Sequence, residues 1–151
     1  MKVLEVRMLA FSKAMRNAVM VMSHLTEAYY DSEMQPISSS DIAATKEISR
    51  PLAAKTLTVL AQFDLVVGST GPGGGYRLSR PPEQISLYEV MTIFRNDKKS
   101  PVCPFGSLKR NHTDPCPLQK RIDPIFSEIY AILKKTNLSI YKGHNKIAKK
   151  K

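Results

Sequence analysis

The stretch STGPGGGYRLSRP, residues 69–81, decides how the rest of the chain is interpreted. Four of the chain's seven glycines lie within five residues here, and Tyr76, Arg77 and Leu78 follow at once. A phosphate-binding loop leads from its glycines into a helix, whereas a strand pattern follows these. Glycine supplies positive φ angles in a turn at no steric cost, so the stretch predicts the tip of a β-hairpin. The first strand of that hairpin is DLVVGS, residues 64–69.

Two short helices separated by a tight turn are predicted directly before this hairpin. In residues 37–49, ISSSDIAATKEIS, the serines can act as N-caps ahead of Asp41. Ser49 then precedes RPLAAKTLTVLAQF, residues 50–63, where Pro51 suits the first turn of a helix. Helix, turn, helix and hairpin in this order are typical of a winged helix. The glycine turn is therefore either a plain hairpin tip or a wing that lies along DNA.

Helical patterns also flank this region. Residues 8–30 contain neither Gly nor Pro and predict a long first helix, whose methionines at 15, 20 and 22 we expect to be core or packing residues rather than ligands. Residues 86–96, SLYEVMTIFRN, begin with Ser86 and carry Glu89 three positions later, the pattern of a capping box. The predicted fold is mainly α with a small β-hairpin wing.

A final amphipathic helix is predicted in residues 118–141, with Pro124 interrupting or starting its main part. Its apolar stripe is Leu118, Ile122, Ile125, Phe126, Ile129, Ile132 and Leu133. An apolar stripe of this length needs another apolar surface to bury it. We expect it to pack against the first helix and across a symmetric dimer.

The charge of the chain favours a polyanionic partner or an anionic membrane surface. Lys and Arg number 23 against 13 Asp and Glu, and the sequence pI is about 9.7. Seven of the lysines lie in residues 134–151, so this end carries most of the net charge of +10. The basic tail is either a solvated chain end or a non-specific contact to phosphate. No apolar run approaches the length of roughly 20 residues that spans a bilayer, and a cytoplasmic location without membrane association is expected. Two cysteines in that compartment indicate thiols or metal ligands.

The segments GPGGGYRLSRP, ISLYEVM, SDIA and CPFG followed by DPCPL resemble the IscR/NsrR-type (Rrf) family of bacterial winged-helix transcription regulators. The resemblance covers residues 8–141. It implies a homodimer that binds a palindromic operator in double-stranded DNA through a recognition helix, a wing and a long C-terminal dimerisation helix. It divides the chain into an N-terminal extension (1–7), a winged helix-turn-helix domain (8–99), a cysteine-containing sensor loop (100–117), the dimerisation helix (118–141) and a basic tail (142–151).

Carried over position by position, the resemblance implies a set of DNA-binding residues. The predicted set is Ser38, Ser39, Ser40, Ser49, Arg50, Lys55, Gly73, Gly74, Tyr76 and Arg77. Arg77 would enter the minor groove from the wing. Arg50 and Lys55 could read guanine in the major groove or contact phosphate. Asp64 departs from the family, which commonly has glycine there, so a differently shaped entry into the wing is expected.

The cysteine loop departs from the family further. Members that sense through iron and sulfur use three cysteines here; Cys103 and Cys116 match the first and third, and Arg110 is nearest to the second. Two other positions that supply ligands in the family are Gln119 and Arg16 in this chain.

Several interpretations of this loop remain open. Cys103 and Cys116 could hold a [2Fe-2S] cluster with ligands from His112, Asp114 or His24. They could bind zinc with His112, or close a regulatory disulfide on oxidation. They could also be remnants of a lost cluster.

The preferred function is a dimeric, sequence-specific DNA-binding regulator, expected to act as a repressor and to respond to the state of the cysteine loop. The alternative is a winged-helix interaction module that contacts nucleic acid only non-specifically, through its basic tail. Enzymatic disulfide exchange is disfavoured because twelve residues separate the two cysteines, whereas such chemistry uses cysteines that are close in the sequence.

Overall fold

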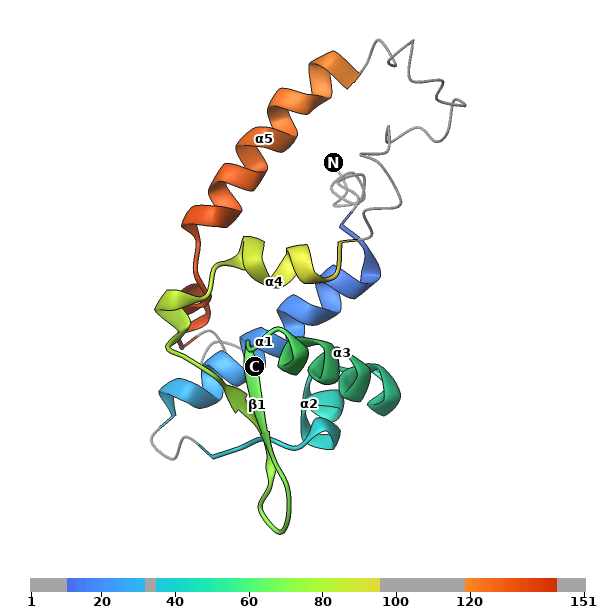
Figure 1. Cartoon of the computed structure of the whole chain (residues 1–151), viewed down its shortest axis with the longest axis vertical. Helices are drawn as coiled ribbons and strands as arrows, with labels where there is room; N and C mark the ends of the chain where they lie inside the picture. The colour runs from blue at the N-terminus through green and yellow to red at the C-terminus, as the bar shows by residue number, and fades with distance from the viewer. Residues whose placement is uncertain (1–10, 32–34, 96–118, 144–151) are drawn as a thin grey trace, which may run out of the picture.

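A computed structural model of the chain describes residues 11–31, 35–95 and 119–143. In this part, helices surround the base of a short β-hairpin (Figure 1). The helices are α1 (Lys13–Tyr30), α2 (Ser39–Thr45), α3 (Arg50–Gln62), α4 (Leu87–Ile93) and α5 (Gln119–Lys135). The strands are β1 (Val66–Ser69) and β2 (Gly75–Leu78), and the 3-10 turns are η2 (Pro82–Gln84) and η3 (Leu138–Tyr141). This arrangement confirms the mainly helical, winged fold.

Helix α1 begins later than its sequence pattern predicts. Ser12 is its N-cap, and its hydroxyl accepts a hydrogen bond from the backbone N–H of Met15 at 3.2 Å, so the predicted start at residue 8 is wrong. The expected apolar face, which includes Met15 and Met22, is buried. Met20 lies on the other side of the helix and is 36% exposed, so it is not part of that buried face.

Helices α2 and α3 form the predicted helix-turn-helix. Ser38 caps α2 by accepting from the backbone N–H of Asp41 at 3.1 Å. The helix ends with the N–H of Ile48 bonded to the carbonyl of Ala43 at 3.0 Å, around Glu47 with a φ of 53°. This closure is a Schellman motif, which turns the chain sharply from α2 into α3.

The hairpin β1–β2 is the predicted wing and is named so below. Its strands are antiparallel, with Val66 opposite Leu78 and Val67 opposite Arg77. The segment before α2 forms an antiparallel bridge with β2, because Ile37 and Tyr76 exchange backbone hydrogen bonds of 3.0 and 2.8 Å. The base of the wing is therefore tied to the start of the helix-turn-helix.

The core lies between α1, α3, α4 and the base of the wing. Its fully buried apolar side chains include Val21, Met22, Leu57, Leu60, Leu65, Ile85 and Val90. Each such side chain contributes roughly 1.5–3 kcal/mol of transfer free energy, which makes this core the main source of stability. Helix α4 begins as predicted, with the Ser86 hydroxyl accepting from the N–H of Glu89 at 3.1 Å.

Helix α5 differs from its prediction in length and packing. It runs through Pro124 and ends at Lys135, because the following backbone pairs with the segment before α4. The N–H of Leu87 donates to Thr136 and the N–H of Leu138 donates to Ile85, both at 2.9 Å. Leu138 is fully buried, so the chain returns to the core through η3.

The contacts of α5 are made with α4 rather than along α1, as Figure 1 shows. The rings of Tyr88 and Tyr130 meet edge to face with their centroids 5.9 Å apart, and Lys134 Nζ lies 4.8 Å from the centre of the Tyr88 ring. Of the stretch predicted as one helix, residues 138–141 (η3) contact the first helix as expected, whereas α5 itself contacts α4. Among the described residues, no helix is long and apolar enough to cross a membrane.

Candidate nucleic-acid interface

The exposed side of α3 carries the predicted base-reading residues. Ser49, Arg50 and Lys55 are all exposed, whereas Ala53 and Leu57 of the same helix are fully buried. Within the described residues, the Ser49 hydroxyl makes no capping hydrogen bond, so it is available at the N-terminus of α3. The amphipathic pattern of α3 thus anchors one face in the core and presents a basic face to solvent.

Sequence reasoning missed two polar residues on that face. Thr58 and Gln62 are exposed and follow Lys55 at helical spacing of three and seven residues. The Thr58 hydroxyl donates to the carbonyl of Ala54 at 2.9 Å, which leaves its oxygen lone pairs able to accept. The signal in the sequence is the polar repeat itself, on the side opposite the buried leucines.

The serines before α2 are less available than predicted. The Ser38 hydroxyl donates to Asp41 Oδ2 at 2.6 Å while it caps the helix, so its hydrogen is already used. Ser39 and Ser40 are half-buried in the first turn of α2. The exposed carboxylate of Asp41 lies in the same turn, and it opposes binding of a phosphate there.

The wing presents glycine backbone at its tip. Gly73 has a φ of 75°, and a Cβ built on it would meet none of the described atoms within 4 Å. A Cβ on Gly74 would lie 2.4 Å from the carbonyl oxygen of Ser69, so glycine is required there for a different reason, the close approach of two backbones. A backbone without side chains can lie close to a nucleic-acid phosphate or sugar.

The two side chains predicted to act from the wing have different environments. Arg77 is exposed, and it stands opposite Val67, which is itself 44% exposed on β1. Tyr76 is half-buried and packs against the core, and its ring lies 3.2 Å from the position that a Cβ on Gly68 would take. Arg77 is thus placed to reach a ligand, whereas Tyr76 holds the wing.

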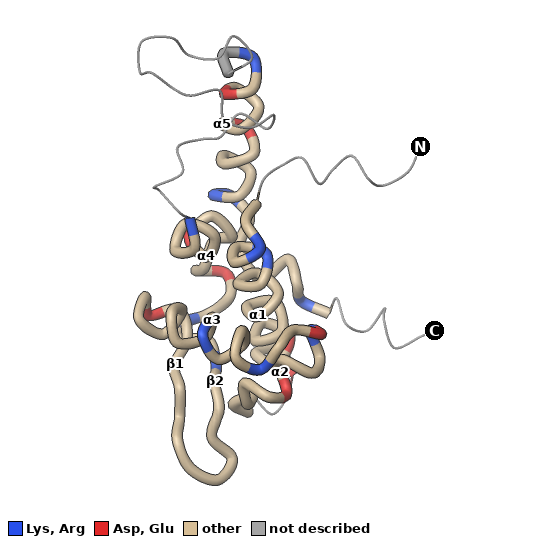
Figure 2. Tube along the Cα trace, turned by 90° about the vertical axis from the view of Figure 1, so that its right-hand side faces the viewer, with Lys and Arg blue, Asp and Glu red and all other residues tan. Residues whose placement is uncertain are grey.

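The basic face of α3 and the wing lie in the same half of the molecule. In Figures 1 and 2, α2, α3 and the hairpin occupy one end, and α5 extends from the opposite end. Figure 2 shows Lys and Arg positions around α2, α3 and the base of the wing, while the tip of the wing is uncharged. The structure therefore brings α3, which contains Arg50 and Lys55, and the wing, which contains Arg77, to one end of the fold.

A hydrogen bond between Tyr30 and Glu83 connects the C-terminal end of α1 to η2. The Tyr30 hydroxyl donates to Glu83 Oε1, and Lys142 Nζ lies 4.7 Å from the centre of the Tyr30 ring. Burial and this hydrogen bond raise the pKa of Tyr30 to about 12. The same bond lowers the pKa of Glu83, with help from Lys142. These contacts join α1, η2 and the end of the described chain.

The predicted metal-binding residues Cys103 and Cys116 lie outside the described residues, as do His112 and Asp114. Of the further candidates, His24 Nδ1 is 3.3 Å from Glu27 Oε2, and that oxygen is also 3.6 Å from Lys46 Nζ. Arg16 is exposed on α1 and brings a cation to a position where the family has an acidic ligand. Within the described ranges, no three His, Cys, Asp or Glu side chains are grouped to hold a metal ion.

Comparisons with known proteins show which family and fold this chain resembles. A curated protein of Aquifex aeolicus named as an HTH-type transcriptional regulator is 24% identical over 130 residues, which are 85% of this chain and 88% of that protein. The solved structure of T. potens IscR superposes with a TM-score of 0.67 at 21% identity, covering 87% of this chain and 84% of the other. CymR of B. subtilis, titled the global cysteine regulator, gives a TM-score of 0.68 at 20% identity over 87% of this chain and 94% of its own.

At these identities the two structures show the fold alone. The Rrf2 family model, described as an iron-dependent transcriptional regulator, matches residues 11–140. These relatives are regulators and not enzymes, as the sequence predicts. The chain belongs to the Rrf2 family of transcriptional regulators.

Proposed function

We propose that this chain is a dimeric, sequence-specific DNA-binding repressor. Its α3 would lie in the major groove of a palindromic operator, and the wing would reach the adjacent minor groove. The observation that carries the proposal is that α3, whose exposed residues include Arg50 and Lys55, lies at the same end of the fold as the wing, whose strand β2 contains the exposed Arg77. Arginine and lysine can contact guanine acceptors as well as phosphates, which suits a surface that both reads and holds DNA.

The test is binding to a duplex that the wild-type protein selects from a random-sequence library. We expect Arg77→Ala to weaken binding to this duplex and to reduce by about one the slope of log K against log salt, because one cation no longer displaces a counterion. The measurement is fluorescence anisotropy at several salt concentrations. An unchanged affinity and slope would contradict the wing assignment.

A truncated chain separates this function from non-specific binding through the tail. Removing residues 144–151 keeps Lys142, which contacts the ring of Tyr30, and deletes the lysines beyond it. We expect the truncated protein to bind the selected duplex with its preference over scrambled DNA intact. Loss of all binding would favour the interaction module with a basic tail.

Dimerisation is proposed through α5. Ile125 and Ile132 on this helix are 54% and 57% exposed, so a large part of its apolar stripe is uncovered in the single chain. An exposed apolar stripe of this kind marks an interaction site. A second copy is the occupant that a palindromic operator requires, since two-fold DNA is matched by a two-fold protein.

We also propose that operator affinity depends on the state of Cys103 and Cys116. Support comes from the family, whose model is described as iron-dependent, and from the pair of thiols in the sequence. Protein purified without oxygen should be analysed for visible absorption, iron and sulfide. A colourless, iron-free protein whose DNA binding is insensitive to oxidants and to Cys103→Ser would exclude both the cluster and the thiol switch.

A further inference from the structure

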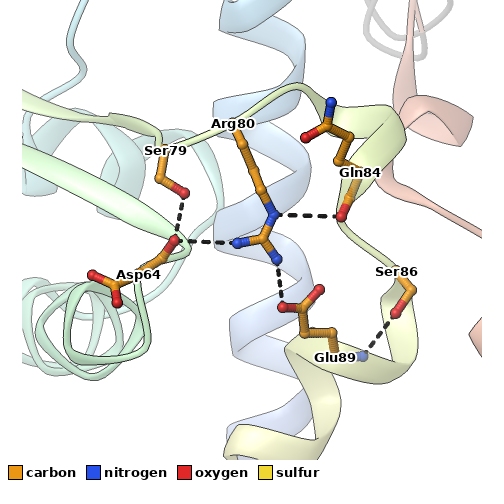
Figure 3. A network of polar contacts seen from close by, with 6 residues as sticks. All are labelled: Asp64, Ser79, Arg80, Gln84, Ser86 and Glu89. Atoms are coloured by element: carbon orange, nitrogen blue, oxygen red, sulfur yellow. Dashed lines mark hydrogen bonds and ion pairs between the residues drawn. The ribbon is translucent and has the colours of Figure 1, made fainter.

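Arg80, just beyond the wing, joins three separate parts of the fold through one guanidinium (Figure 3). Its Nε donates to the carbonyl of Gln84 at 3.4 Å, at the end of η2. Its Nη1 donates to the carbonyl of Asp64 at 3.5 Å, between α3 and β1. Its Nη2 donates to Glu89 Oε1, in the first turn of α4. The acceptors therefore belong to the end of α3, to the connection after the wing and to the start of α4.

We propose that Arg80 and Glu89 are positioning residues for DNA binding, and that together they set the orientation of the wing relative to α3 and α4. This inference rests on the proposed function, because it concerns how the wing is presented to DNA. Neither residue is among the predicted DNA contacts, and Arg80 points from the chain after β2 toward α4, as Figure 3 shows.

The geometry suits the planar fork of arginine. Each of three nitrogens on the planar guanidinium serves a different acceptor, whereas a lysine would bring a single ammonium that cannot reach all three sites. Asp64 is held from a second side as well, because the Ser79 hydroxyl also donates to its carbonyl. The Asp64 carbonyl, just before β1, is thus hydrogen-bonded to Ser79, just after β2. Arg80 links the same carbonyl to Glu89 of α4.

The length of the wing makes this anchor important. Each strand has four residues, which extend about 13 Å at the usual rise of about 3.3 Å per residue. A rotation of about 10° at the base would move the tip by roughly 2 Å on that length. Such a displacement is enough to lose contacts to a groove, since binding groups need to be held to within about 0.5 Å.

Stability alone does not account for the arrangement. The side chains of Arg80 and Glu89 are 31% and 39% exposed, and ion pairs at such exposure contribute little to the free energy of folding. The core residues described above hold the fold without this pair. Its loss should therefore change the orientation of the wing far more than the population of folded protein.

The test compares Arg80→Lys and Glu89→Gln with the wild type on the duplex that the wild type selects. We expect each variant to bind roughly three- to tenfold more weakly, with the salt slope unchanged, because no phosphate contact is lost. Glu89→Gln is decisive, since removing a negative charge would by itself strengthen binding to a polyanion. We expect the double variant to bind no more weakly than the weaker single variant, because both changes break one connection.

The matched control is Asp31→Asn, which removes an exposed carboxylate at the end of α1. Its binding should equal or slightly exceed that of the wild type. Hydrogen exchange supplies a second measurement that needs no DNA: amides of residues 66–78 should exchange faster in both test variants, while those of α1 keep their protection.

The outcomes separate the two proposals. Wild-type or tighter binding by Glu89→Gln, or unchanged exchange in the wing, would overturn the positioning role and leave the proposed function in place. If the wild type selects no sequence from the library, the proposed function fails and the positioning role fails with it.

Discussion

Two acidic residues occupy left-handed backbone positions at the ends of α2 and α3. Glu47 follows α2 with a φ of 53°, and Asp64 follows α3 with a φ of 55°. Both helices close in the same way, and for α3 the N–H of Leu65 bonds to the carbonyl of Leu60 at 3.0 Å. Asp64 therefore adopts the left-handed conformation that glycine favours.

This conformation leads to a prediction for Glu47→Gly. A side chain in the left-handed region costs roughly 1–2 kcal/mol, and glycine removes most of that cost. Removing an acid from a helix C-terminus adds a few tenths of a kcal/mol. We expect the free energy of unfolding to rise by about 1 kcal/mol, measured by urea denaturation, with a smaller rise for Asp64→Gly because aspartate tolerates this region better.

The matched control is Glu47→Ala, which removes the charge and keeps the Cβ. It should recover only the electrostatic part of the gain. A rise as large as that of Glu47→Gly would show that charge, and not backbone conformation, limits stability at this turn.

At the scale of the wing, positions 73 and 75 favour glycine for different reasons. A Cβ on Gly75 would lie 2.6 Å from the carbonyl carbon and oxygen of Ile37, whereas a Cβ on Gly73 meets open space. We expect Gly75→Ala to lower the free energy of unfolding by roughly 2 kcal/mol, because the added Cβ would break the backbone pairing between Ile37 and Tyr76. Gly73→Ala should cost about 1 kcal/mol, from its positive φ alone. Equal losses in thermal melts of the two variants would contradict this account.

The sequence predicts the elements that carry their own signals. Capping serines at 38 and 86 mark the starts of α2 and α4, and the glycines with their flanking β-branched residues mark the wing. The start of α1 was predicted too early, although its Ser12 cap is a local signal, whereas the end of α5 was missed because a tertiary partner decides it. The α5 pattern continues past Lys135, yet the backbone of Thr136 and Leu138 pairs with residues 85–87 instead.

The candidate interface was predicted to a similar extent. Sequence reasoning can propose Arg50, Lys55 and Arg77, since long cations on a solvent face need no partner within the fold. It cannot show which polar groups are used internally. The Ser38 hydroxyl is bound to Asp41, and Tyr76 packs on the core, and both facts depend on distances that only the folded chain defines.

For the whole molecule, the uncovered face of α5 predicts how self-association can be broken. Ile132→Lys places a charge in the proposed contact between two copies, and a buried unpaired ammonium is costly. We expect the dimer to dissociate at least roughly tenfold more readily in sedimentation equilibrium, with the helical content unchanged. Ser127→Lys is the control, because Ser127 is exposed on the opposite side of α5 and its change should leave the association intact. Identical dissociation of both variants would exclude this face.

The uncharged tip of the wing has a kinetic consequence for the proposed complex. Long-range attraction between a protein and DNA depends on charge, and residues 65–76 contain no acidic or basic side chain. The cations of α3 would therefore draw the duplex in, and the tip would engage only after the two surfaces meet. Changes in the tip should then alter how long the complex lasts, whereas changes at Arg50 or Lys55 should also alter how fast it forms.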